Sequence, residues 1–307
     1  MKISILGTGA IGSLFAAGLS EKHDLTCIVK PESHAEAIRR DGIRIVEADG
    51  SVRTAFPEAV TETGGMQPSQ LVLIAVKAPS TGEAVRTHRD IFGEETFAIS
   101  LQNGYGNHAD IESVVSPERI LIGTTAQGAN IDSEGRVHHA GSGMTTIGAL
   151  RPESEKAARM LAEVKKIFDD AGLKTEITED AEDAVIRKLF INTGINAVCA
   201  LNDTKNIGVV TDPQMNEQAR LLVMEAVDVF RRAGREYDAQ EIWQHVLSVA
   251  RATGENYCSM VQDIRKGRPT EILRINGAVA DIARSLHFDA PLNRKVTAEV
   301  EALSKRR

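Results

Sequence analysis

The sequence predicts a mixed α/β fold in two parts, a doubly wound α/β domain over residues 1–179 and an all-helical domain over residues 180–307. Two observations predict this division. Short apolar runs alternate with helix-like segments in the first part, which is typical of a parallel sheet covered by helices on both faces. In the second part the strand-like runs stop and helical segments follow one another. We expect the two domains to pack closely and to form a cleft.

Local patterns predict the individual elements. Apolar runs bounded by turn residues indicate strands, and periodic segments with start and stop signals indicate helices. We expect strands at residues 2–6, 25–30, 70–78, 97–103, 119–125 and 174–178, and an antiparallel extension at 137–150. We expect helices at residues 10–20, 81–92, 152–172, 180–201, 212–234, 238–252, 256–266, 271–287 and 291–304.

Composition argues against several classes of protein. The formal net charge of −7 gives no general support for nucleic-acid binding. The three cysteines, Cys27, Cys199 and Cys258, are odd in number and lack metal-ligand spacing, so neither a disulfide framework nor a metal site is expected. Apolar runs such as 71–76 are far shorter than the roughly 20 residues that span a membrane, and the first residues do not resemble a signal peptide. We therefore expect a cytoplasmic protein without nucleic-acid or membrane partners.

A glycine motif follows the first predicted strand and opens the first predicted helix. Residues 7–12 read GTGAIG and match G-x-G-x-x-G in the context that supports dinucleotide binding. Gly7 allows the tight turn, Gly9 lets the backbone approach a pyrophosphate, and Gly12 lets the helix pack close to the strand. The helix N-terminus then favours phosphate binding. We expect a Rossmann-type cofactor site at Gly7, Thr8, Gly9, Ala10, Ile11 and Gly12; the alternative is a glycine-rich turn in another α/β protein.

The end of the second predicted strand bears on the choice between NAD and NADP. An NAD site usually carries Asp or Glu there to bind the ribose 2′-hydroxyl, whereas this chain has Lys30. A cation attracts a 2′-phosphate, so NADP(H) is the expected cofactor. Two alternatives stay open: Glu32 is the missing acid, or Lys30 is a solvated loop lysine.

Two more polar residues close predicted strands, at the sheet edge where open α/β folds bind ligands. Lys77 ends the run LVLIAVK and suits a cofactor phosphate or a substrate, although a lysine snorkelling from a strand end fits the spacing equally well. Asn103 precedes Gly104, and its amide suits a nicotinamide carboxamide or a substrate carbonyl. An ordinary Asn-Gly turn is the alternative for Asn103.

Three polar residues interrupt the apolar segment 184–200 at steps of four: Lys188, Asn192 and Asn196. At about 100° per residue they share a sector of roughly 80°. Val185 and Cys199 fall in the same sector, so a solvent-facing stripe is a poor explanation. Buried polar groups need partners, either a substrate or an internal hydrogen-bond network. A lysine in a dry cleft has a lowered pKa and suits general-acid catalysis.

Taken together, these motifs resemble the ketopantoate reductase (2-dehydropantoate 2-reductase) family over nearly the whole chain. The matching stretches are GTGAIG at 7–12, VKA around Lys77, LQNGYGN around Asn103, RKLFINTGIN at 187–196 and ENYCSMVQDIRKGRPTEILRINGAV at 255–279. The last stretch is long and is much more specific than the glycine motif.

The resemblance implies roles for residues of the helical domain. Lys188 would be the general acid, and Glu271 would bind the substrate hydroxyl and position it near Lys188. Further polar residues would line the substrate site: Asn103, Asn192, Asn196, Asn206, Asn256 and Ser259. Asn103 would lie near the nicotinamide and the reacting carbonyl. Without the resemblance, Glu271 would be interpreted as an acid in the first turn of a helix, and Ser259 as an ordinary helical residue.

The resemblance also implies roles at the cofactor. Lys30 occupies the place of a basic residue that recognises the 2′-phosphate, and Lys77 would help to bind the cofactor. One departure concerns Ser80, because the family often has Gln at that position. The departure puts strict selectivity for NADP in doubt.

We therefore expect an NADP-dependent oxidoreductase that reduces 2-dehydropantoate to (R)-pantoate, a step toward pantothenate and coenzyme A. The partner would be a small 2-oxo acid. The sequence does not determine the oligomeric state, and a homodimer is the assembly that we consider. One alternative is a reductase of another 2-oxo acid on the same scaffold; β-hydroxyacid dehydrogenases also pair a Rossmann domain with a helical domain and a catalytic lysine. The other is an NADP-sensing protein without catalysis, which would not need the full set of site residues.

Overall fold

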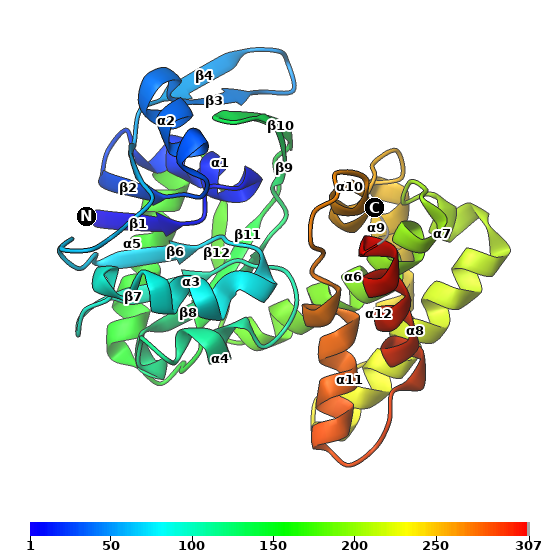
Figure 1. Cartoon of the computed structure of the whole chain (residues 1–307). Helices are drawn as coiled ribbons and strands as arrows, with labels where there is room; N and C mark the ends of the chain where they lie inside the picture. The colour runs from blue at the N-terminus through cyan, green and yellow to red at the C-terminus, as the bar shows by residue number, and fades with distance from the viewer. Residues whose placement is uncertain (306–307) are drawn as a thin grey trace. The chain divides into compact units, whose positions relative to one another are not determined.

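The computed structural model describes residues 1–305, which group into two compact units (Figure 1). The first unit comprises Met1–Gln102 and Asn107–Ala184, and the second comprises Asn103–Gly106 and the chain from Val185 onward. The predicted fold class is confirmed, because the first unit is mixed α/β and residues 185–305 form helices and connecting turns. The segment Asn103–Gly106 groups with the helical unit although the chain on both sides of it belongs to the α/β unit.

An eight-stranded sheet forms the centre of the α/β unit, with the order β12-β11-β8-β7-β6-β1-β2-β5. The six strands from β8 to β5 pair in parallel. The chain winds outward in both directions from β1, so the strand order reverses between β1 and β6, and ligands of such sheets bind beside the carboxyl ends at that point. The bounds are β1 Lys2–Leu6, β2 Asp24–Ile28, β5 Glu58–Val60, β6 Leu71–Ile74, β7 Phe97–Ser100, β8 Ile120–Thr125, β11 Thr145–Ala149 and β12 Thr175–Ile177.

A second, four-stranded sheet in this unit was not predicted. Its order is β4-β3-β10-β9, with β4 Val52–Ala55, β3 Ile43–Val46, β10 Arg136–Gly141 and β9 Gly128–Ser133. Strand β3 pairs in parallel with β10, which lies far away in the sequence, so local patterns do not reveal the pairing. The expected antiparallel extension is present, since β10 pairs antiparallel with β9 and β11 with β8.

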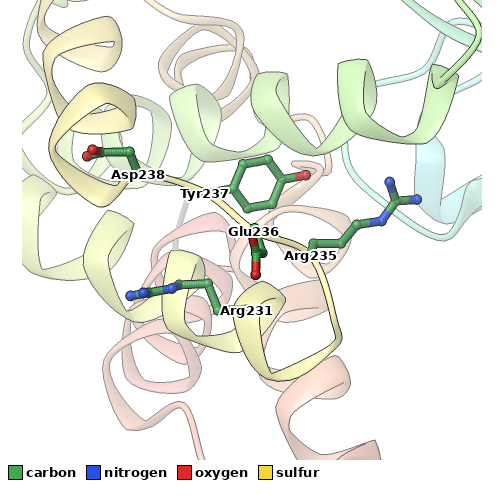
Figure 2. Close-up of a pocket in the computed structure, with 5 residues that line it drawn as sticks. All are labelled: Arg231, Arg235, Glu236, Tyr237 and Asp238. Carbon is green, nitrogen blue, oxygen red and sulfur yellow. The ribbon is translucent and has the colours of Figure 1, made fainter.

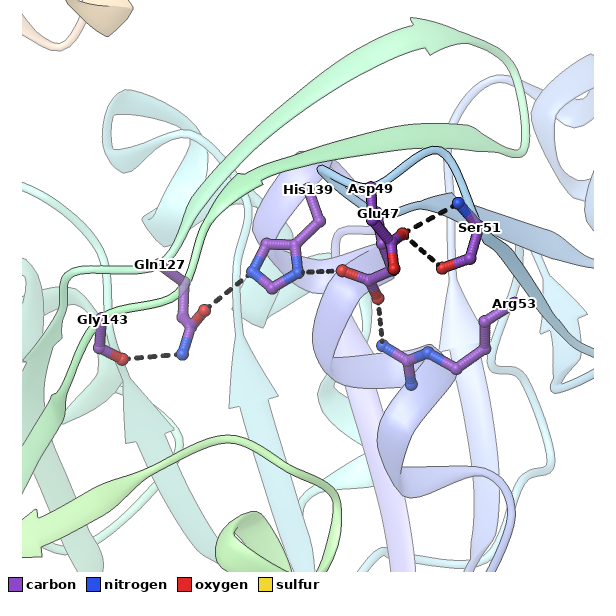
Figure 3. A network of polar contacts seen from close by, with 7 residues as sticks. All are labelled: Glu47, Asp49, Ser51, Arg53, Gln127, His139 and Gly143. Carbon is purple, nitrogen blue, oxygen red and sulfur yellow. Dashed lines mark hydrogen bonds and ion pairs between the residues drawn. The ribbon is translucent and has the colours of Figure 1, made fainter.

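A chain of polar contacts anchors the second sheet to the connections around it (Figure 3). The His139 ring on β10 contacts Glu47 Oε2 through Nδ1 at 2.6 Å and Gln127 Oε1 through Nε2 at 3.0 Å. Gln127 in turn donates from Nε2 to the Gly143 carbonyl at 2.7 Å, and Arg53 lies 3.5 Å from Glu47 Oε1. These contacts stabilise the connections that flank β9 and β10.

Five α-helices complete the α/β unit: α1 Ala10–Leu19, α2 Glu32–Asp41, α3 Thr81–Thr87, α4 Asn107–Ile111 and α5 Glu155–Asp170. Helix α1 contacts strands of both sheets and also α5, where Phe15 meets Phe168 edge-to-face at 5.0 Å. Helix α4 contacts β7 and β8, and α3 packs on α4. The segment expected to form one helix at 81–92 instead ends at Thr87 and continues as a 3₁₀ turn.

Helices α6 to α12 account for the second part of the chain: α6 Ala181–Asn202, α7 Gly208–Thr211, α8 Pro213–Arg232, α9 Ala239–Ala252, α10 Ser259–Arg265, α11 Asn276–Ser285 and α12 Pro291–Ser304. Asp212 and Asp238 cap α8 and α9, each accepting two backbone N–H bonds through one carboxylate oxygen. Phe190 on α6 packs edge-to-face on Phe230 and Tyr237, with ring centroids 5.5 and 5.0 Å apart.

The helix expected at 271–287 begins later than predicted. A 3₁₀ turn at Ile272–Arg274 comes first, and α11 begins at Asn276. Ile272 and Ile275 are both buried, and their spacing of three matches the three residues per turn of a 3₁₀ helix. The interpretation of Glu271 as a residue in the first turn of an α-helix is therefore wrong, because Glu271 precedes the 3₁₀ turn instead.

Helix α6 is, within residues 1–305, the one helix that is long and apolar enough by length and composition to cross a membrane. Most of its apolar stretch is buried inside the protein, as in the core helix of a globular fold. Its apolar character therefore reflects packing in the helical unit.

Candidate active site

The glycine turn after β1 combines two crowded positions with one open position. A Cβ on Gly7 would lie 2.6 Å from Val76, and one on Gly12 would lie 2.1 Å from the Gly7 carbonyl oxygen. Gly7 also has a φ of +97°, which favours glycine. A Cβ on Gly9 would meet no protein atom within 4 Å. Gly7 and Gly12 are thus required for local packing, whereas Gly9 leaves open space beside the backbone, as a bound pyrophosphate requires.

Two side chains that the motif does not mark support this turn. The Thr8 carbonyl accepts hydrogen bonds from Ser13 Oγ and His34 Nε2, each at 3.1 Å. Because a carbonyl can only accept, His34 must carry its proton on Nε2. The buried Thr8 Oγ1 has no hydrogen-bond partner within residues 1–305, which fits a turn that binds a polar group. His34 lies on α2, and no sequence motif identified it.

Lys30 lies beyond the end of β2 and not within it. The strand ends at Ile28, and the Lys30 side chain is exposed, with its Nζ 3.8 Å from Glu83 Oε1. Glu32, the alternative acid, is held elsewhere, since it accepts a 2.8 Å hydrogen bond from Thr61 and pairs with Arg39. A solvent-accessible cation is therefore present at the carboxyl end of β2, and the nearby acid already has local partners.

Lys77 lies just past the carboxyl end of β6, exposed, and immediately before a 3₁₀ turn. Gln102 supports this turn by donating from Nε2 to the Val76 carbonyl and to Thr81 Oγ1, each at 2.7 Å. The amide thereby ties the end of β7 to the segment that carries Lys77. Sequence patterns did not distinguish Gln102 from other residues of the Asn103 motif.

Lys188 combines a half-buried side chain with a lowered pKa. Burial lowers the pKa of its ammonium to about 8, and the negative charge of Glu271 partly opposes that shift. Leu189, Ile195 and Cys199 are almost completely buried, so the side of α6 that carries Lys188 packs inside the protein and is not a solvent-facing stripe. A lysine with a pKa near neutrality can donate and recover a proton at ordinary pH.

Glu271 is itself buried and bonded to a second predicted residue. Its side chain is 6% exposed, and Oε2 accepts a hydrogen bond from Asn103 Nδ2 at 3.1 Å. The loop that carries Asn103 docks on the same turn, because Tyr105 N donates to the Arg274 carbonyl at 2.8 Å. Gly104 has a φ of +86°, and a Cβ there would lie 2.3 Å from that carbonyl oxygen. Glycine is therefore required for Asn103 to reach Glu271.

Three more predicted residues lie on α6 and at the start of α10. Asn196 is 5% exposed, and its carbonyl accepts a weak bond from Cys258 Sγ at 3.7 Å, so the residue before Ser259 packs on α6. Ser259 is exposed as the first residue of α10. Asn192 is half-buried, and its Nδ2 is a buried atom without a hydrogen-bond partner in residues 1–305. Such an unsatisfied donor can bind an oxygen atom of a ligand.

Asn206 and Asn256 form a separate pair. Asn206 N donates to the Asn256 carbonyl at 3.0 Å, and Asn206 Nδ2 donates to Thr253 Oγ1 at 2.9 Å. The other amide atom, Oδ1, is buried and lacks a partner in the described chain. Asn206 is therefore partly a structural residue, and Asn256 is exposed.

A surface pocket of about 500 Å³ lies elsewhere in the helical unit and is lined by Arg231, Arg235, Glu236, Tyr237 and Asp238 (Figure 2). None of these is a predicted site residue. The two arginine side chains point in opposite directions, so they do not form a joint anion site. No group of three or more His, Cys, Asp or Glu side chains in residues 1–305 is arranged to hold a metal ion.

Two protein-family models match successive parts of the chain. Residues 3–152 match the family model described as ketopantoate reductase PanE/ApbA, and residues 180–304 match the model of its C-terminal part. The chain is 33% identical to the 2-dehydropantoate 2-reductase of Halobacterium salinarum over 100% of this chain and 99% of that protein. It is also 33% identical to the protein of that name from Pyrococcus horikoshii, over 98% and 97% respectively.

A solved structure of D-mandelate dehydrogenase with NADH and anilino(oxo)acetate is also similar. It has a TM-score of 0.93 and 25% identity, and the match covers 100% of this chain and 99% of that one. The full-length matches, together with Lys188, Glu271 and Asn103 in one cluster, lead to one conclusion: the chain belongs to the ketopantoate reductase family.

Proposed function

We propose that this chain catalyses the NADPH-dependent reduction of 2-dehydropantoate (ketopantoate) to (R)-pantoate, in the pathway to pantothenate and coenzyme A. The observation that carries the proposal is the Lys188–Glu271–Asn103 cluster in a chain 33% identical, over its whole length, to a protein named 2-dehydropantoate 2-reductase. We further propose residues 1–179 as the cofactor domain and residues 180–307 as the substrate and catalytic domain. The family models, which match residues 3–152 and 180–304, support this division.

Reduction of a carbonyl requires a hydride at carbon and a proton at oxygen. When bound, NADPH supplies the hydride. Lys188 supplies the proton from its Nζ to the developing alkoxide, and its pKa of about 8 makes this transfer favourable near neutral pH. The charged ammonium also stabilises the negative charge that develops on the oxygen.

The remaining polar residues of the cluster position the substrate. Glu271 accepts a hydrogen bond from the substrate hydroxyl, and Asn103 keeps the carboxylate in place by donating to Oε2. Asn192 and Asn196 donate to the substrate from the same sector of α6 as Lys188, and the buried, unsatisfied Asn192 Nδ2 supports this assignment. Ser259, Asn206 and Asn256 complete the proposed binding site.

The proposed cofactor site is made by residues at the carboxyl ends of the parallel strands. The open space beside Gly9 and the unsatisfied Thr8 Oγ1 fit a dinucleotide phosphate. Lys30 favours a 2′-phosphate, and Glu32 is held by Thr61 and Arg39. Lys77 is the second cation that we assign to the cofactor.

A second candidate function is the reduction of a different 2-oxo acid on the same fold. The specific observation in its favour is the similarity, with a TM-score of 0.93, to D-mandelate dehydrogenase in complex with NADH. A non-catalytic NADP sensor is a weaker alternative, because a sensor does not need a lysine with a pKa near neutrality.

The proposal also includes a cytoplasmic location and a homodimeric assembly. Cys27, Cys199 and Cys258 are buried and unpaired, which fits a reducing compartment. Size-exclusion chromatography with light scattering tests the assembly.

Substrate identity is tested by steady-state kinetics with ketopantoate and a panel of 2-oxo acids, including the oxo acid of mandelate. We expect the highest kcat/KM for ketopantoate with NADPH, because ketopantoate carries the hydroxyl group that Glu271 is proposed to bind. NADH is measured in parallel. A higher kcat/KM for another oxo acid would establish the second candidate function instead.

Replacing the proposed acid tests the mechanism. Lys188→Ala should lower kcat by about 10²–10⁴, the usual effect of removing a general acid, with little change in the Kd for NADPH. Arg187→Ala is the matched control, because Arg187 is the adjacent residue on α6 but pairs with Glu241 at 3.5 Å. If Lys188→Ala retained the wild-type kcat, Lys188 would have no role in proton transfer.

The pH dependence follows from the lowered pKa of Lys188. The acid must be protonated, so kcat should be constant below pH 8 and should fall about tenfold per pH unit well above the pKa of about 8. Glu271→Gln should move this alkaline limb to lower pH, because the carboxylate raises the pKa of Lys188. Glu241→Gln, which removes an exposed carboxylate, is the control and should leave the limb in place.

Cofactor selectivity is tested by reversing the charge beyond β2. Lys30→Glu should lower kcat/KM for NADPH by about 10- to 100-fold, since a hydrogen bond to a charged group contributes about 1.5–3 kcal/mol, and should affect NADH much less. Lys22→Glu is the matched control, because Lys22 precedes the opposite, amino end of β2. Equal effects on both cofactors would contradict the role of Lys30.

A further inference from the structure

Four helices of the helical unit share a chain of buried amides that none of the proposed site roles explains. Asn276, the first residue of α11, is fully buried and donates from Nδ2 to Asn293 Oδ1 at 2.9 Å and to the Thr193 carbonyl at 3.3 Å. Asn293 on α12 is also fully buried and donates from Nδ2 to the Leu222 carbonyl at 3.1 Å and to Glu225 Oε2 at 2.8 Å. This hydrogen-bond network thus connects α8, α12, α11 and α6, which are labelled in Figure 1.

The hydrogen-bond partners in this network determine the orientation of each amide. Glu225 also accepts from the backbone N–H groups of Leu292 and Asn293 at 3.1 and 2.7 Å, so its carboxylate is held at the start of α12. The two acceptors around Asn293 Nδ2 require the Asn293 oxygen to face Asn276. Asn276 must then present its N–H groups both to that oxygen and to the Thr193 carbonyl. A flipped Asn276 amide would place oxygen against oxygen, which is costly in a buried site.

The position of Asn276 connects this network to the proposed catalytic pair. Only Ile275 lies between Asn276 and the single 3₁₀ turn that begins after Glu271, so little flexible chain separates Asn276 from Glu271. Thr193 lies on α6, the helix that carries Lys188. The buried side chains of Ile272 and Ile275 hold the turn in the core, but apolar packing has no preferred direction. The directional bond from Asn276 to Thr193 therefore sets how the Glu271 turn is aligned along α6.

We propose that Asn276 is a positioning residue that holds the Glu271 turn in register with the Lys188 helix through the Thr193 carbonyl. Asn276 does not touch the substrate in this proposal; it acts through Glu271. Its catalytic consequence rests on the proposed role of Lys188 as the proton donor. Its structural consequence, a defined distance between the Glu271 carboxylate and the Lys188 ammonium, does not depend on that role.

The test measures the pKa of Lys188 directly, by competitive acylation at a series of pH values with peptide mass spectrometry. Asn276→Leu removes the donor at similar volume, so the Glu271 turn loosens and the pKa of Lys188 should fall by up to about 1 unit as the opposite charge recedes. We expect kcat to fall about 10-fold, since small misplacements in an active site can cost up to 10²-fold, and the Kd for NADPH to stay unchanged. Asn276→Ser, which retains one hydroxyl donor, should partly restore both values.

Asn293→Leu is the matched control, because it removes an equally buried amide from the same network but leaves the bond from Asn276 to Thr193. It should lower the midpoint of urea unfolding as Asn276→Leu does, without moving the pKa of Lys188. If Asn276→Leu does not fold, Asn276→Ala and Asn293→Ala provide the same comparison. An unchanged Lys188 pKa in the Asn276 variants, or an equal shift in the Asn293 variants, would overturn the proposal. Acylation does not require turnover, so failure of the proposed reaction would be recognised separately.

Discussion

Removing an ammonium group from water lowers its pKa, and a nearby carboxylate offsets part of that decrease. The proposed site in the helical unit depends on the balance between these two effects. Burial lowers the pKa of Lys188 to about 8, and Glu271 prevents a larger decrease. Without burial, the lysine would keep its proton too strongly to be an effective acid near neutral pH. Without the carboxylate, the pKa would fall further and the lysine would be less protonated. Both conditions require that α6 and the Glu271 turn keep a defined separation.

In the proposed function, the two units would use different parts of the polypeptide. In the α/β unit the glycine turn offers mainly backbone, and Ser13 and His34 hold it from behind through the Thr8 carbonyl. In the helical unit the proposed chemistry would depend on side chains that local packing orients, such as Asn103 on Glu271. Backbone geometry at the glycine turn suits many dinucleotide enzymes, so the proposed reaction depends on the side-chain cluster for its specificity.

Much of the fold and part of the site could be predicted from sequence patterns. The strand β1, the glycine turn and α6 have strong local signals, so they were identified from spacing alone. Glu271 was identified only through family resemblance, because an acid beside a predicted helix has an ordinary explanation. The four-stranded sheet was missed, since β3 and β10 are short and distant in sequence. His34, Gln102 and Asn276 were missed because each acts through hydrogen bonds to groups that are remote in the sequence.

The sequence by itself determined the α/β and helical division, the glycine turn and the shared sector of Lys188, Asn192 and Asn196. These follow from periodicity and backbone sterics, which are local properties of the chain. Tertiary structure alone decided that Asn103 meets Glu271, that Glu32 is held by Thr61 and Arg39, and that Asn276 bridges α11 and α6. Hydrogen bonds and charge interactions act over a few ångströms in space. Which groups come within that range therefore depends on how the whole unit packs.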